Sequence, residues 1–141
     1  MTMYEFKIIT SLVIVDDKKR FLLGKRSMHE DVFPGLWSIP GGKVESPLPI
    51  HDTFEKNVKK EVLEEFGVEV EVLDYIESHS DGKNKIYVEF LGKIAKGEPR
   101  PLEDTDEVRW FKFEEIEKSK LCPEVYDVLK KVKKGLLATT L

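Results

Sequence analysis

Residues 60–68 of the chain are KEVLEEFGV, and this stretch decides how the rest of the sequence is interpreted. Within and before it, bulky apolar residues recur at every fourth position: Phe54, Val58, Val62 and Phe66. That spacing predicts a helix with one buried stripe. Asp52, with Glu55 three residues later, predicts a capping pattern at the start of the helix, and Gly67 predicts a left-handed cap at its end.

Three glutamates of this helix lie near its apolar stripe. With about 100° of rotation per residue and Phe54 at zero, Glu61 falls at about −20°, Glu65 at about +20° and Glu64 near −80°. Two carboxylates one turn apart at a packing edge lose water and repel each other. A divalent cation between them would remove both penalties, and Mg²⁺ and Mn²⁺ prefer carboxylate oxygens. Taken alone, the pattern is more typical of a solvated helix with ion pairs, so the neighbouring residues decide.

The neighbouring residues 40–45 are PGGKVE, and together with the glutamate helix they resemble the Nudix box. That family signature runs G-x5-E-x7-R-E-U-x-E-E-x-G-U, where U is a bulky aliphatic residue. The flanking segments 21–26, 35–40 and 107–111 are also similar to the family, so the resemblance spans roughly residues 6–115.

The resemblance departs from the signature at three points. The loop after Gly42 is four residues longer, Asp52 stands for the first box glutamate, and Lys60 stands for the box arginine. In the family, that acid and that arginine hold the glutamates in position. Lysine keeps the positive charge but cannot form the two-pronged hydrogen bond of arginine.

The order of the expected elements is that of an α/β protein. Apolar runs at 6–15 and 20–25, separated by the polar residues 16–19, predict a β-hairpin. Further strands are expected at 68–75, 85–95 and 107–113. The segment from Pro40 to Gly42 is expected to break regular structure. A last helix is expected from Pro123 to about Lys134, with three residues on its inner side: Val125, Leu129 and Val132. The resemblance implies a Nudix-like α/β/α sandwich, with a mixed β-sheet between helices, formed by a single domain of residues 1–141.

The resemblance also implies a metal site and a reaction. Glu61 and Glu65 would hold Mg²⁺, or alternatively Mn²⁺, assisted by Glu64 and the backbone carbonyl of Gly42. Water would attack a phosphorus atom of a pyrophosphate bridge, and the catalytic residues would be Glu61, Glu64 and Glu65. The general base would be Glu61 or an acid of the 103–107 loop.

Three residues are expected to bind substrate: Arg26, Lys43 and Glu107. Arg26 ends a predicted strand and is equally compatible with a surface arginine, and the acidic loop that contains Glu107 is equally compatible with a solvated turn. Trp37 and Tyr87 could stack on a base, but aromatic residues in predicted strands are more typical of a core.

Composition limits the partners and the location. Among 141 residues, 40% are hydrophobic and 35% are charged, which is typical of a globular protein. The net charge of −4 argues against a nucleic-acid polymer as partner. Cys122 is the only cysteine, which fits a reducing, cytoplasmic location. The apolar run at 8–15 is far shorter than the roughly 20 residues of a membrane helix, so no membrane is expected. The expected partner is a small nucleotide, and the chain would be a monomer or a homodimer.

The expected function is that of a magnesium-dependent nucleoside triphosphate pyrophosphohydrolase, which releases a nucleoside monophosphate and pyrophosphate. Marks of other Nudix subgroups are missing outside the box. A nucleotide-sugar hydrolase is the first alternative, because residues 21–26 and 35–37 also resemble GDP-mannose hydrolases. The second alternative is a Nudix module that senses a nucleotide without cutting it. The longer loop and Lys60 fit a domain that has diverged from the catalytic signature. Retention of all three glutamates favours catalysis.

Overall fold

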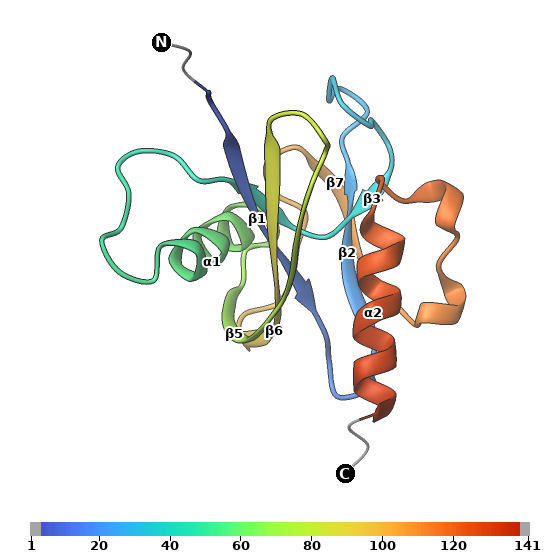
Figure 1. The fold of residues 1–141 in the computed structure, drawn as a ribbon. Coiled ribbons are helices and arrows are strands. Elements are labelled where there is room, and N and C mark those ends of the chain that lie inside the picture. Colours follow the sequence, from blue (N-terminus) through green and yellow to red (C-terminus); the bar gives the residue numbers. More distant parts are fainter. Residues whose placement is uncertain (1–3, 139–141) are drawn as a thin grey trace.

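In the computed structural model, which describes residues 4–138, the strands divide into two sheets (Figure 1). The first sheet has the strand order β4-β1-β6-β5, formed by β4 (Gly41–Lys43), β1 (Lys7–Ile14), β6 (Lys85–Lys96) and β5 (Glu69–Ser80). The second has the order β3-β2-β7, formed by β3 (Trp37–Ser38), β2 (Phe21–Arg26) and β7 (Thr105–Phe111). The helices are α1 (Thr53–Phe66), α2 (Val125–Ala138) and two short 3-10 turns, η1 (Phe113–Glu115) and η2 (Lys118–Lys120).

Strands lie between the two helices, as Figure 1 shows. Successive side chains of β1 point to opposite faces, so Leu12 and Ile14 pack in the core beneath α1 while Val13 packs in the core beneath α2. The first sheet is mixed, because β1 runs parallel to β6 and antiparallel to β4. The expected α/β/α sandwich is therefore confirmed, with its strands shared between two sheets.

The predicted hairpin between residues 6–15 and 20–25 is wrong. β1 pairs with β4 and β6, whereas β2 pairs with β3 and β7, and only an isolated bridge from Val15 to Phe21 joins the two segments. Both strands are buried on both faces along consecutive residues, which is the pattern of a strand in the middle of a sheet. Each strand consequently becomes central in a sheet of its own.

Helix α1 confirms the predicted stripe and its end, but not its start. Val58, Val62 and Phe66 are buried, and the N–H of Gly67, at a φ of 69°, donates to the carbonyl of Leu63. The capping prediction for Asp52 is wrong, since this residue has a left-handed φ of 51° and makes no side-chain capping bond.

Three further boundaries differ from the sequence-based expectation. Residues 41–43 form the strand β4 instead of a break, β5 continues to Ser80, and Phe113 belongs to η1 rather than to a strand. The predicted last helix is confirmed as α2, with Val125, Leu129 and Val132 buried. Among residues 4–138, neither helix is both long and apolar enough to cross a membrane.

Two glycines allow a matched test of this packing. A Cβ atom at Gly92 on β6 would lie 2.6 Å from the backbone oxygen of Glu71 on the neighbouring strand. Gly92→Ala should therefore lower the free energy of unfolding by about 1–3 kcal/mol. Gly135 lies in α2, where an added Cβ meets no described atom within 4 Å, so Gly135→Ala should raise stability by about 0.5–1 kcal/mol. Denaturant unfolding measures both, and equal effects would contradict the close approach of β5 and β6.

Candidate active site

The candidate site forms where the last turns of α1 meet β4. The backbone N–H of Gly41 donates to Oε2 of Glu65 over 3.2 Å. A Cβ atom at Gly42 would collide with the carboxyl group of Glu61 and lie 2.9 Å from its Cγ. Glycine at 42 thus lets the strand backbone lie directly against the Glu61 carboxyl group, whereas glycine at 41 allows close approach to β1, where a Cβ would lie 2.7 Å from Oγ of Ser11.

Asn57 fastens the helix in this position. Its side chain is buried, and Nδ2 donates to Oγ1 of Thr10 over 2.8 Å and to the carbonyl oxygen of Gly42 over 3.2 Å. One amide therefore connects α1 to both β1 and β4. The sequence analysis did not identify Asn57, although a polar residue one turn before Glu61 and next to Val58 was a detectable signal.

Asp52 and Lys60, which stand where the family signature has its acid and its arginine, lie outside this contact. Asp52 is exposed. Lys60 forms an ion pair with Glu64 over 3.9 Å, and its side chain is 65% exposed. Glu64 belongs to this outer ion pair, so it borders the site rather than filling it.

Burial strongly perturbs the two inner carboxyl groups. It raises the pKa of Glu65 to about 8, although the Gly41 hydrogen bond opposes the shift, and the charge of Glu61 adds to it. Burial also raises the pKa of Glu61, and the charge of Glu64 contributes further. Glu61 and Glu65 therefore lie close together, as the sequence predicts. Their surroundings disfavour the charged form of both carboxyl groups.

Two further acids act on this pair. The negative charge of Glu103 raises the pKa of both Glu61 and Glu65, and that of Glu45 raises the pKa of Glu61. Within the acidic 103–107 loop, Glu103 is thus the residue that influences the site. Glu107 lies on β7, where it forms an ion pair with Arg109 over 2.6 Å.

Of the other expected substrate-binding residues, Arg26 lies near the glutamates. It ends β2, its Nε donates to the carbonyl of Val32 over 2.9 Å, and its positive charge lowers the pKa of Glu65. Lys43 is exposed at the end of β4.

The donor atoms of the site fit a divalent cation. A cation would relieve the burial and the repulsion that raise the pKa values of Glu61 and Glu65. The Gly42 carbonyl accepts from Asn57 and keeps a second lone pair. Within residues 4–138, no three His, Cys, Asp or Glu side chains converge as ligands. Water or phosphate oxygens would therefore complete the shell, as is usual for Mg²⁺.

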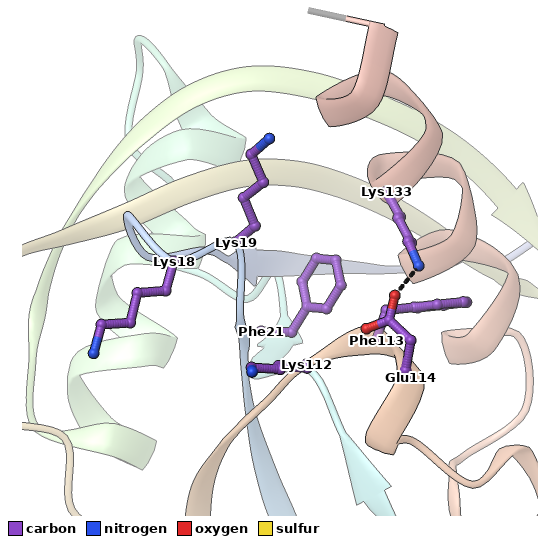
Figure 2. A pocket seen from close by; sticks show the side chains of 7 residues that line it. All are labelled: Lys18, Lys19, Phe21, Lys112, Phe113, Glu114 and Lys133. Carbon is purple, nitrogen blue, oxygen red and sulfur yellow. Dashed lines mark hydrogen bonds and ion pairs between the residues drawn. The ribbon is translucent and has the colours of Figure 1, made fainter. Parts of the chain in front are cut away.

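A separate hollow of about 190 Å³ lies at the opposite end of β2 (Figure 2). Its lining is Lys18, Lys19, Phe21, Lys112, Phe113, Glu114 and Lys133. Lys133 forms an ion pair with Glu114, and the side chains of Lys18 and Lys19 point in different directions. Phe21 borders this hollow and Arg26 the glutamates, about 16 Å away along the strand. This hollow is therefore not part of the candidate site.

Comparisons with known proteins bear on the fold and the family. The NUDIX domain model matches residues 6–132. The nucleoside triphosphatase NudI of Klebsiella pneumoniae subsp. pneumoniae is 26% identical over 113 residues, which cover 73% of this chain and 80% of that protein. A MutT Nudix hydrolase from Burkholderia pseudomallei is 27% identical with a TM-score of 0.75, covering 91% of this chain and 98% of that one. A Nudix hydrolase structure from Nitrosomonas europaea has a TM-score of 0.84 at 22% identity, covering 98% of this chain and 76% of that one.

The raised pKa of Glu65 predicts how stability depends on pH without metal. Between its ordinary pKa of 4.5 and its folded pKa of about 8, the folded protein keeps a proton that the unfolded chain has lost. The contribution of Glu65 to stability is therefore fully present below pH 4.5 and is lost as pH rises towards 8. Melting temperatures measured in EDTA across this range should show the fall.

Matched variants test how much of this fall in stability with pH comes from Glu65. Glu89, whose pKa burial also raises to about 8, adds to the fall with the same sign, so Glu65→Gln should remove only part of it. Lys59→Gln, on the exposed side of α1, should leave the slope unchanged. An unchanged slope in Glu65→Gln would show that Glu65 is not desolvated as described.

Proposed function

Since this chain belongs to the Nudix family of hydrolases, which cleave phosphoanhydride bonds, we propose that it is a magnesium-dependent nucleoside triphosphate pyrophosphohydrolase. Its products would be a nucleoside monophosphate and pyrophosphate. The substrate class is supported by the likeness to nucleoside triphosphatase NudI, 26% identical over most of that protein's length.

The contact of Glu65 and Glu61 with the Gly41–Gly42 backbone is the observation that supports catalysis most directly. Two desolvated carboxyl groups side by side destabilise a protein unless a bound cation or another partner offsets the cost. A module that only binds a nucleotide could replace them with neutral residues of similar size. Their retention in a packed position favours a cation-dependent hydrolase over a sensor.

The chemistry follows from the residues around these two carboxyl groups. A divalent ion held by Glu61, Glu65 and the Gly42 carbonyl would withdraw charge from the phosphate oxygens and lower the pKa of a bound water. The oxygen of the attacking water bonds to phosphorus, and the bond from that phosphorus to the bridge oxygen breaks. The leaving group keeps the electron pair, and it is pyrophosphate for attack on the α-phosphorus or the nucleoside monophosphate for attack on the β-phosphorus.

The proton of the attacking water passes to a carboxylate of this chain. Glu61 is the first choice because Glu65 is already fixed by the Gly41 amide, and Glu103 is the second. The guanidinium of Arg26, held by the carbonyl of Val32, would bind the phosphate oxygens.

Turnover of nucleoside triphosphates in Mg²⁺ should depend on Glu65. Phosphate released in the presence of added pyrophosphatase reports cleavage of triphosphates. For nucleotide sugars, phosphate released from the monoester products by added alkaline phosphatase reports cleavage. Glu65→Gln should lower kcat by about 100-fold or more. Lys59→Gln, on the exposed side of α1, serves as the matched control and should keep wild-type activity.

Three other outcomes would change the proposal. Turnover restricted to nucleotide sugars would favour the alternative hydrolase. Absence of turnover with nucleotide binding intact would favour a sensor. Near wild-type activity in Glu65→Gln would remove this residue from the reaction.

A further inference from the structure

A further buried carboxyl group lies apart from Glu61 and Glu65 of α1. Glu89 on β6 is 2% exposed, and its Oε1 has no hydrogen-bond partner among the described residues. Nδ1 of His79 lies 2.6 Å from this oxygen, but the two groups are not aligned as a hydrogen bond. A buried polar atom without a partner destabilises the fold, and such groups are concentrated at functional sites.

Strand register relates Glu89 to the candidate active site. Ser11 on β1 lies opposite Gly41 on one side and opposite Glu89 on the other, so these residues form a row across three strands. At about 4.8 Å between neighbouring strands, the backbone of Glu89 is about 10 Å from that of Gly41. Because the Gly41 amide holds Glu65, Glu89 lies at the far end of a row that starts at the catalytic carboxylates. The sugar of a nucleotide can span this separation.

The row faces the space between the two sheets. Val13 and Leu91, each two residues beyond a member of the row, point to the core beneath α2, and strand alternation directs Ser11 and Glu89 to the same side. Gly41 and Ser11 are small, so Glu89 has the only long side chain in this row.

Aromatic rings border the carboxyl group. Tyr87, two residues before Glu89 on the same face, stacks on His79 with ring centroids 4.8 Å apart and an interplanar angle of 11°. Both rings are half-buried, so part of each ring faces solvent beside Glu89. A flat heterocycle with a hydrogen-bond donor matches these surroundings, because the rings offer stacking surfaces and the Glu89 carboxyl group keeps acceptor lone pairs beyond its contact with His79.

We propose that Glu89 determines nucleobase specificity by accepting a hydrogen bond from the exocyclic amino group of the base. This inference rests on the proposed function, because it assigns the base of the same nucleotide substrate. Adenine, cytosine and guanine carry such an amino group. Uracil presents its N–H between two carbonyl oxygens, which repel an acceptor. The enzyme therefore prefers amino-bearing bases to uracil.

Binding of nucleoside monophosphates tests this assignment without requiring hydrolysis. AMP, CMP, GMP and UMP are titrated into wild type, Glu89→Leu and Glu89→Gln and followed by NMR, which detects weak binding. Wild type should bind at least one amino-bearing monophosphate about tenfold more tightly than UMP. Glu89→Leu should lose this preference while its UMP affinity changes less than about threefold. Glu89→Gln, which keeps an acceptor oxygen, should retain most of the preference.

A purely structural role for Glu89 gives different results. In that case Glu89→Leu would weaken all four ligands equally, and the ratio of amino-bearing monophosphate affinity to UMP affinity would stay as in wild type. Absence of any base preference in wild type would also overturn the assignment, even with hydrolysis intact. Base-selective binding without hydrolysis of any nucleotide would instead overturn only the proposed function.

Discussion

The docking of α1 against β4 is the contact on which the rest of the site depends. Asn57 holds the helix to Thr10 and to the Gly42 carbonyl, and the Gly41 amide holds Glu65. These bonds cross between a helix and two strands far apart in sequence. Any side chain at Gly42 would push the helix away, because the Glu61 carboxyl group occupies that space. Backbone geometry, rather than loop flexibility, thus brings two carboxyl groups to a strand edge.

The same contact explains why the site is electrostatically unfavourable in the absence of a cation. Burial raises the pKa of both Glu61 and Glu65, and the neighbouring acid Glu103 raises them further. Nearby positive charge comes from Arg26, which lowers the pKa of Glu65, and from Lys60, whose side chain is largely exposed. Packing of the apolar stripe holds this arrangement in place, since Val58, Val62 and Phe66 anchor the opposite edge of the helix in the core. A divalent cation is the simplest addition that makes the arrangement favourable.

Local periodicity accounts for what the sequence could predict. The helix, its end at Gly67 and the inward position of Glu61 and Glu65 depend only on spacing within one element, and all appear in the structure. Partners that are distant in the chain could not be predicted in this way. The sheets adopted by β1 and β2 depend on burial of both faces, and the contacts of Asn57 and Glu89 depend on which strands become neighbours. Asp52 failed as a cap because its backbone is left-handed, whereas a capping residue is normally extended.

Direct counting of bound metal tests the central claim that the α1–β4 contact forms a divalent-cation site. Free Mn²⁺ can be measured by EPR during titration of the nucleotide-free protein. Wild type should bind Mn²⁺ at one or more sites, and Glu65→Gln should weaken this binding by at least about tenfold, as for loss of a principal ligand. Glu64→Gln, which removes the ion pair with Lys60 and one charge beside Glu61 but neither inner carboxyl group, should have a smaller effect. Equal Mn²⁺ binding by wild type and Glu65→Gln would contradict the account.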